Sequence, residues 1–201
     1  MVRGFSVSVW LLASTAPFVG VATADATRDA ASAMPQDGVT ITTVNYTIPP
    51  VHLVRETGQS VLLTQELDDG RPVIMNFIFT TCETTCPLSS QTFAQFQSRL
   101  GPEDRRVHMV SISIDPEHDT PQRLRAYANK FHAGPQWQHY TGTLRDSLAA
   151  QQAFGAYRGD KMGHTPLTLL RAAPGEPWTR IEGFVTPDQL LHHYRRLLAA
   201  R

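Results

Sequence analysis

The sequence is poor in cysteine: its 201 residues contain only two, Cys82 and Cys86, four positions apart. A chain of this length can bury enough apolar surface to fold without disulfides, which excludes the small disulfide-dependent folds. A bond between the two cysteines would also close a very short loop and remove little entropy from the unfolded chain. A purely structural disulfide is therefore disfavoured, and a redox pair or two metal ligands remain as alternatives.

The chain also lacks an excess of charge of either sign. Eighteen Lys and Arg residues balance eighteen Asp and Glu residues, and no basic stripe is present. Nucleic-acid binding requires concentrated positive charge on one surface, so no nucleic-acid partner is expected. There is no internal repeat either, and we expect one folded domain that is a monomer.

Long hydrophobic runs are missing except at the N-terminus. Residues 1–24 contain an early positive charge, Arg3, then the apolar run FSVSVWLLASTAPFVGV and small residues suited to cleavage. This pattern predicts a secretory signal peptide. An uncleaved membrane anchor is the alternative, because residues 5–21 approach the length of a bilayer span.

A short polar segment separates this N-terminal run from the domain. Residues 25–38 are small, polar and proline-bearing, and they predict a flexible leader before a domain at residues 39–201. Export would place the domain in the periplasm or at the outer face of the inner membrane, with the N-terminal segment as an optional tether. In such an oxidising compartment two neighbouring thiols form a disulfide unless they are reduced or bind a metal.

Strand and helix patterns alternate along the domain. Residues 51–63 predict a β-hairpin, and the continuous apolar run at 73–79 predicts a strand that is buried on both faces. Residues 107–115 predict a second central strand. Further helices are expected at 87–100, 120–131, 143–154 and 186–198, and further strands at 137–141, 167–171 and 178–185. This order predicts an α/β, thioredoxin-like fold with a mixed, mostly parallel central sheet, flanking helices and the hairpin as an N-terminal extension.

The two cysteines lie in FTTCETTCPL, between a buried strand and the start of a helix. Helix N-terminal amides and the helix dipole favour thiolate over thiol, which lowers the pKa of a cysteine placed there. Three intervening residues put the sulfurs about one helical turn apart, so both can face a common centre. Two thiolates select Cu(I), or zinc if enough further ligands exist. The motif alone leaves metal binding and thiol chemistry open.

A third ligand would have to come from elsewhere, and the chain has eight histidines. Seven of them lie in ordinary elements, turns or solvated faces and are expected to be structural or exposed: His52, His108, His118, His132, His139, His192 and His193. His164 differs because it stands in a glycine-flanked loop, GDKMGHTPLTLL, directly before a strand, where sites are commonly built. Met162 nearby is either an extra thioether ligand or a packing residue.

Three segments in order, FIFTTCETTCPLSS, VSISIDPEHDTPQRLRAYANKF and KMGHTPLTLL, resemble the Sco/SenC family of copper-binding, thioredoxin-like proteins. The resemblance runs from about residue 48 to residue 198. It implies one copper ion, Cu(I) or Cu(II), bound by Cys82, Cys86 and His164. It further implies a copper chaperone for the CuA centre of cytochrome c oxidase subunit II, or for another cuproprotein. The SIDPEHDTP stretch carries no expected ligand, although Asp115 and Glu117 are candidates for shaping the partner surface.

A second function remains open beside copper delivery. In a thiol–disulfide oxidoreductase, Cys82 and Cys86 would be a catalytic pair that reduces cysteines of a cuproprotein partner. Pro166 stands where thioredoxins place a cis-proline facing the cysteines, and a cis Thr165–Pro166 bond would favour this function. The chain would then be an enzyme, whereas a metallochaperone is not one. A peroxidase-like activity rests on fold analogy alone.

Overall fold

The computed structural model describes residues 34–36, 38–101 and 106–199, together with Met1 and Gly4. The expected signal peptide or anchor, and the leader up to residue 33, lie outside the described residues. Residues 34–36, at the end of the predicted leader, form β1 (Met34–Gln36), which pairs antiparallel with β2 (Val39–Val44). No helix in the described part of the chain is long and apolar enough to span a bilayer.

The described strands form one sheet in the order β1-β2-β9-β8-β5-β6-β7-β3-β4. The seven strands that follow β2 have these bounds: β3 (His52–Arg55), β4 (Ser60–Leu62), β5 (Val73–Ile78), β6 (His108–Ser113), β7 (Trp137–Gly142), β8 (Leu167–Arg171) and β9 (Trp178–Glu182). The mixed sheet is confirmed, and so is the predicted hairpin, which is β3 and β4.

The expected majority of parallel pairs is not found. Only β5 with β6 and β6 with β7 are parallel, whereas every other pair of neighbouring strands in this sheet is antiparallel. Strands joined by a short turn, such as β3–β4 and β8–β9, can pair only in the antiparallel sense. The central strands alone are linked by helical crossovers, which parallel pairing requires.

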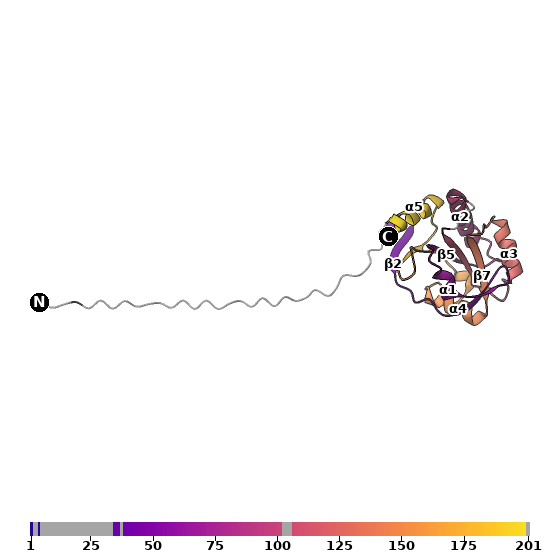
Figure 1. Ribbon diagram of the computed structural model, residues 1–201, viewed down its shortest axis with the longest axis horizontal. Coiled ribbons are helices and arrows are strands. Elements are labelled where there is room, and N and C mark those ends of the chain that lie inside the picture. The colour runs from indigo at the N-terminus through magenta and orange to yellow at the C-terminus, as the bar shows by residue number, and fades with distance from the viewer. Residues whose placement is uncertain (2–3, 5–33, 37, 102–105, 200–201) are drawn as a thin grey trace. The chain divides into compact units, whose positions relative to one another are not determined.

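Helices cover both faces of this sheet (Figure 1). The described helices are α1 (Leu63–Leu67), α2 (Thr85–Leu100), α3 (Pro121–Lys130), α4 (Leu144–Ala153) and α5 (Pro187–Ala199). A short 3₁₀ turn, η1 (Lys161–Gly163), precedes β8. The predicted start of α3 is confirmed, because the Thr120 hydroxyl accepts a hydrogen bond from the amide of Arg123 and Pro121 occupies the first turn.

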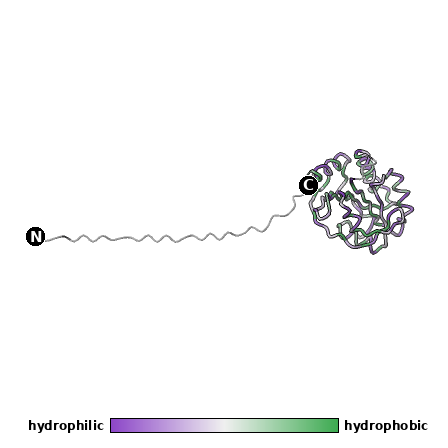
Figure 2. Tube along the Cα trace, viewed as in Figure 1, coloured by the Kyte–Doolittle hydropathy of each residue, from purple (hydrophilic) through white to green (hydrophobic). Residues whose placement is uncertain are grey.

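Two apolar clusters, one on each face of the sheet, form the core. All residues of β5 and β6 are buried, which agrees with the apolar run of β5, whereas β6 also buries the polar side chains of His108, Ser111 and Ser113. One cluster packs beneath α2, α3 and α5 and contains Phe93, Phe96, Leu124, Tyr127 and Leu190. The other packs against α1 and α4 and contains Leu63, Leu67, Phe77, Ala150 and Phe154. Figure 2 shows hydrophobic residues concentrated in the interior strands.

Candidate functional site

The cysteine loop connects the end of β5 to the first turn of α2. Cys82 precedes the helix, and Cys86 lies inside its first turn. The amide of Cys82 donates to the carbonyl of Phe79 at 3.2 Å, and the amide of Cys86 donates to the Cys82 sulfur at 3.4 Å. Both thiols are free; Cys86 is buried, whereas Cys82 is partly exposed. The predicted placement of both sulfurs at a helix start is confirmed.

The two thiols differ in acidity. Burial raises the pKa of Cys82, but hydrogen bonds from the amides of Cys86 and Thr84 outweigh burial and bring that pKa below its ordinary value. Burial dominates at Cys86 and raises the pKa of its thiol far above the ordinary range, and the nearby Cys82 raises it further. The lowering expected for helix-start cysteines thus applies to Cys82 alone. The pair consists of one accessible, acidic thiol and one buried, protonated thiol.

His164 follows η1 and is 9% exposed. Its Nε2 lies 3.0 Å from the main-chain carbonyl oxygen of Phe77, which can only accept, so Nε2 carries the proton. Nδ1 is therefore the unprotonated nitrogen, and it is buried without a hydrogen-bond partner. Burial lowers the pKa of the imidazole despite the Phe77 bond, so the ring is neutral. A neutral ring with one fixed and one unpartnered nitrogen has the form of a metal ligand.

The end of β5 links His164 to the cysteine loop. The β5–β8 ladder ends at Asn76 and Thr168, and the carbonyl of the next residue, Phe77, is bound by the His164 ring. Phe79 then contacts both parts, because its carbonyl accepts from the Cys82 amide and its ring meets the His164 ring edge-on, with centroids 6.5 Å apart. The structure therefore gathers all three candidate ligands at one end of the sheet.

The three donors do not form a closed cluster. Among the described residues no three His, Cys, Asp or Glu side chains are close enough together to hold a metal ion. Cys82 and Cys86 are joined by the hydrogen bond between them, and His164 stands apart on its own loop. A shared ligand would require the His164 loop or the cysteine loop to shift.

Other residues considered from the sequence take clearer roles. Met162 is 76% exposed, so the packing alternative for this side chain is wrong. The Thr165–Pro166 bond is trans, like every peptide bond in the described part of the chain. His108 and His139 are fully buried, as expected of structural histidines, and His118 is exposed beside Asp115.

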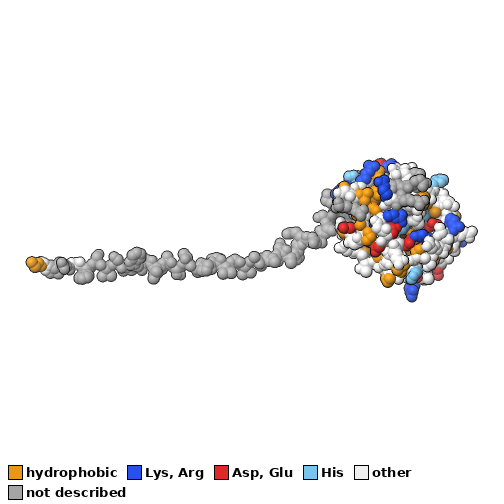
Figure 3. Space-filling view, in the orientation of Figure 1, with side chains coloured by type: hydrophobic (Ala, Val, Ile, Leu, Met, Phe, Trp, Pro, Cys, Tyr) orange, Lys and Arg blue, Asp and Glu red, His pale blue; other side chains and the backbone are white. Residues whose placement is uncertain are grey.

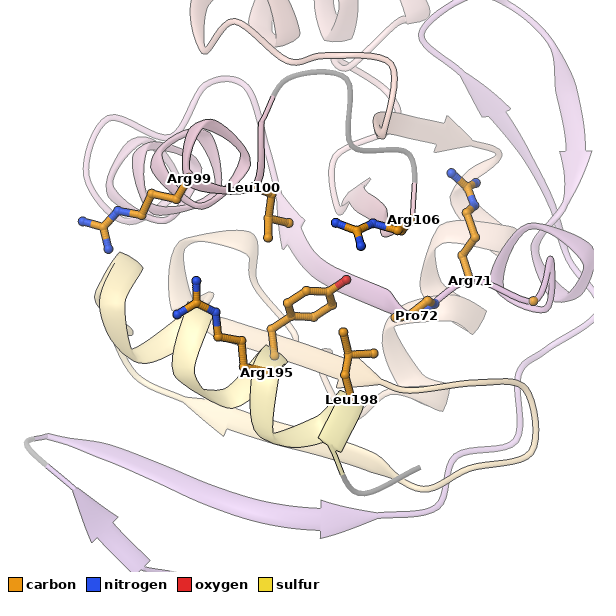
Figure 4. A pocket seen from close by; sticks show the side chains of 9 residues that line it. Arg71, Pro72, Arg99, Leu100, Arg106, Arg195 and Leu198 are labelled. Carbon is orange, nitrogen blue, oxygen red and sulfur yellow. The ribbon is translucent and has the colours of Figure 1, made fainter.

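Two cavities flank opposite ends of the sheet. One, of about 440 Å³, adjoins His164 and lies between residues 114–118 and 156–161. The other, of about 620 Å³, lies at the N-terminal end of β5, where Figure 4 shows Arg71, Arg99, Arg106 and Arg195 around an apolar floor. Arg71 bonds to Asp69 and Arg99 to Asp188, so both have acidic partners. This second cavity is remote from the cysteines.

Charges of both signs are interspersed on the face seen in Figure 3. No continuous basic area covers that face, in agreement with the balanced composition.

A family model described as SCO1/SenC matches residues 39–199. The chain belongs to the SCO1/SenC family. Over 106 residues it is 33% identical to the SCO1 protein homolog of Bacillus subtilis (strain 168), a match that covers 52% of this chain and 54% of the relative. This Sco-family chain thus spans about half the length of the curated relatives it matches.

Solved structures of Sco proteins share its fold. Arabidopsis thaliana ScoI with copper bound superposes with a TM-score of 0.64 at 23% identity, covering 76% of this chain and 98% of that one. BsSco, in a structure reporting a disulfide switch, gives a TM-score of 0.64 at 24% identity and covers 79% and 97%. The thioredoxin-like fold predicted from the order of elements is confirmed by these likenesses.

Proposed function

We propose that this Sco-family protein binds one copper ion through Cys82, Cys86 and His164 and delivers it to a cuproprotein. The observation that carries the proposal is the state of His164: its Nδ1 is buried, unprotonated and without a partner. Leaving a buried polar atom unpaired costs about 1–3 kcal/mol. A soft metal ion held between this nitrogen and the two thiols would remove that cost.

The donor set suits Cu(I). Two thiolates and one imidazole are soft and borderline ligands, and they favour Cu(I) over hard cations. Cys82 is the first sulfur to engage, because it is accessible and its pKa is lowered. Cys86 must give up its proton when it binds, because burial keeps its thiol protonated. With three protein ligands, a thiolate of the recipient can enter and replace one of them, so copper passes without release to solvent.

The relatives supply the proposed recipient and location. Arabidopsis ScoI has been solved with copper bound, and BsSco is described as a member of the Sco family of cytochrome c oxidase assembly proteins. We take the CuA centre of cytochrome c oxidase subunit II as the recipient of copper from this chain. We place the domain outside the cytoplasm, in the periplasm or at the outer face of the inner membrane.

A Cu(I) titration of the reduced protein tests the proposal. One equivalent of Cu(I) should bind. Loss of a group that only bonds to a metal ligand typically weakens metal binding by about 10- to 100-fold, and His164→Ala should weaken Cu(I) binding by more than this. His52→Ala is the matched control, because His52 is an exposed histidine on β3. Equal Cu(I) affinity in the wild type and His164→Ala would exclude His164 as a ligand.

A second function, reduction of a partner disulfide, is favoured by the unequal acidity of the two thiols. An accessible thiolate at Cys82 can attack a disulfide, and a buried thiol at Cys86 can then resolve the mixed disulfide. Cys86→Ser should trap a mixed disulfide through Cys82, whereas Cys82→Ser should trap none. If neither variant traps a protein or a small disulfide, this second function is excluded.

A further inference from the structure

The segment at residues 115–120, just after β6, carries two buried carboxylates that reach both loops of the proposed site. Asp119 is 0% exposed. Its oxygens accept from the Thr80 amide at 3.1 and 3.2 Å, from the Thr80 hydroxyl at 2.5 Å and from the Ser113 hydroxyl at 2.6 Å. Both carboxylate oxygens are thereby satisfied, as a buried charge requires.

These contacts fix the start of the cysteine loop. Thr80 comes two residues after the end of β5 and two before Cys82. Asp119 binds the amide and the hydroxyl of Thr80 together, so both the main chain and the side chain are held at this point. The course of the chain into Cys82 is therefore set by a residue far away in the sequence.

Asp115 makes the corresponding contact with the His164 loop. Asp115 is 6% exposed, and its Oδ2 lies 2.7 Å from Nζ of Lys161. Lys161 opens η1, and its carbonyl accepts the amide of His164 at 3.1 Å. Burial raises the pKa of Asp115, but Lys161 and His118 outweigh it and keep the carboxyl ionised. Lys161 therefore links Asp115, through its side chain, to the main chain of His164, through its carbonyl.

Apart from the bond of the His164 ring to the Phe77 carbonyl, the turn before His164 has few contacts with the rest of the fold. η1 contains no buried residue, and Gly159 before it has a left-handed φ of +81°. Asp160 caps the turn internally through the amide of Met162, which fixes its shape but not its position. Lys161 extends toward the site, with Nζ 5.9 Å from the Phe79 ring centroid.

Ser113 joins the Asp119–Thr80 contact and the Asp115–Lys161 ion pair into one network. Its hydroxyl donates to Asp119 and accepts from the amide of Asp115 at 3.0 Å. Its carbonyl accepts from the hydroxyl of Ser147 on α4, which ties the network to the helix layer. Thr80 and Lys161 therefore connect through a continuous chain of buried groups rather than through solvent.

We propose that Asp119 and Asp115 are positioning residues, which keep the cysteine loop and the His164 loop close enough that a small shift of either loop lets Cys82, Cys86 and His164 share one ligand. The copper readout below rests on the proposed function, but the nuclear magnetic resonance readout does not. Neither aspartate contacts the ligand in this account. Each acts through its partner, Thr80 or Lys161.

The role of the Asp115–Lys161 ion pair is tested by two substitutions, one that removes a negative charge and one that removes a positive charge. Asp115→Asn and Lys161→Met both break the ion pair, and both should weaken Cu(I) binding by about tenfold, as for other outer-shell partners. A purely electrostatic influence on the anionic thiolates would move the two variants in opposite directions, because one removes a negative and the other a positive charge. Lys130→Met on α3 is the control for loss of an exposed lysine.

The role of the Asp119–Thr80 contact is tested at Thr80. Replacing the fully buried Asp119 could unfold the protein, and this effect could not be told apart from a displaced cysteine loop. Thr80→Val removes the hydroxyl donor and keeps the shape, whereas Thr80→Ser keeps the donor. We expect Thr80→Val to bind Cu(I) about tenfold more weakly and Thr80→Ser to bind like the wild type. Equal Cu(I) binding by Thr80→Val and the wild type, with one copper in each, would overturn the claim that Asp119 positions the cysteine loop through Thr80.

A metal-free measurement separates this inference from the proposed function. In histidine-labelled, reduced protein, the His164 ring resonances report its bond to Phe77. They should shift in Asp115→Asn and in Lys161→Met and stay unchanged in Lys130→Met. If the wild type binds no copper, the proposed function fails, and the ring resonances still decide the positioning role. Unchanged His164 resonances in both ion-pair variants would overturn it.

Discussion

The amide of Cys86 donates a hydrogen bond to the sulfur of Cys82 at 3.4 Å, so one cysteine stabilises the thiolate of the other. Three residues lie between them, and the bond forms because α2 begins at Thr85, between the two. The same geometry buries Cys86 within the core beneath α2. Two thiols with similar sequence surroundings therefore have opposite properties.

This asymmetry predicts the order of alkylation. In reduced, metal-free protein near neutral pH, iodoacetamide should modify Cys82 well before Cys86, because the thiolate reacts and the pKa is lowered at Cys82 and raised at Cys86. Peptide mass spectrometry against time measures both rates. Cys82→Ser should abolish the fast phase, and a fast phase that persisted in Cys82→Ser would contradict the assignment.

Copper affinity should depend on pH. Cys86 is protonated in the metal-free protein, so Cu(I) binding must displace at least its proton. The apparent affinity should fall by about tenfold for each pH unit of acidification, as expected when one proton is displaced. Competition with a chromophoric chelator at several pH values gives the slope. A slope of zero would mean that Cys86 remains a thiol in the complex.

His139 should make the fold sensitive to acid. It is fully buried against Trp137, with ring centroids 5.0 Å apart and no hydrogen-bond partner on either nitrogen. Burial lowers its pKa from 6.5 to about 3, so below pH 6.5 the unfolded chain binds a proton that the folded chain excludes. The free energy of unfolding should therefore decrease as the pH is lowered from about 6.5 toward about 3, by up to about 1.4 kcal/mol per pH unit for this group.

Urea unfolding of the wild type and His139→Phe at about pH 7 and about pH 5 measures this effect. The variant removes the titrating ring but keeps an aromatic side chain of similar size. Its free energy of unfolding should change less between the two pH values than that of the wild type. The same loss in both proteins would assign the acid sensitivity to other groups.

Gly183 should resist substitution. Its φ is +105°, and a Cβ at this position would lie 2.8 Å from the carbonyl oxygen of Gly38, while its amide donates to the carbonyl of Pro166. Gly183→Ala should lower the free energy of unfolding by about 1–3 kcal/mol through strain and close contact. Gly175→Ala is the matched control, because φ there is +81° but nothing lies within 4 Å of the added Cβ. Chemical denaturation should show the larger loss at Gly183.

Much of the fold could be predicted because its elements carry local signals. The buried runs of β5 and β6, the hairpin at residues 51–63 and the Thr120–Pro121 helix start all follow from spacing and capping. β2 was missed because its alternation is interrupted by threonines and its partner, β9, lies far along the chain. Pairing direction at the sheet edges depends on such distant partners, which local patterns do not encode.

The site divides in the same way. The placement of both cysteines at a helix start is local and was predictable, as was a glycine-flanked histidine before a strand. The difference in acidity between Cys82 and Cys86 was not, because it depends on how deeply each thiol is buried. The contact of Asp119 with Thr80 spans 39 positions and lies in a motif that looks like an ordinary turn. Only the folded chain brings these groups together.

The acceptor that fixes the His164 ring is a main-chain carbonyl, that of Phe77. Every amino acid carries that oxygen, so no replacement of the side chain at position 77 can delete it. The orientation of the imidazole is therefore shielded from point mutation at its own partner, as long as β5 and β8 stay paired. Mutational drift can reach this ring only through the register of the sheet or through the loop that carries it.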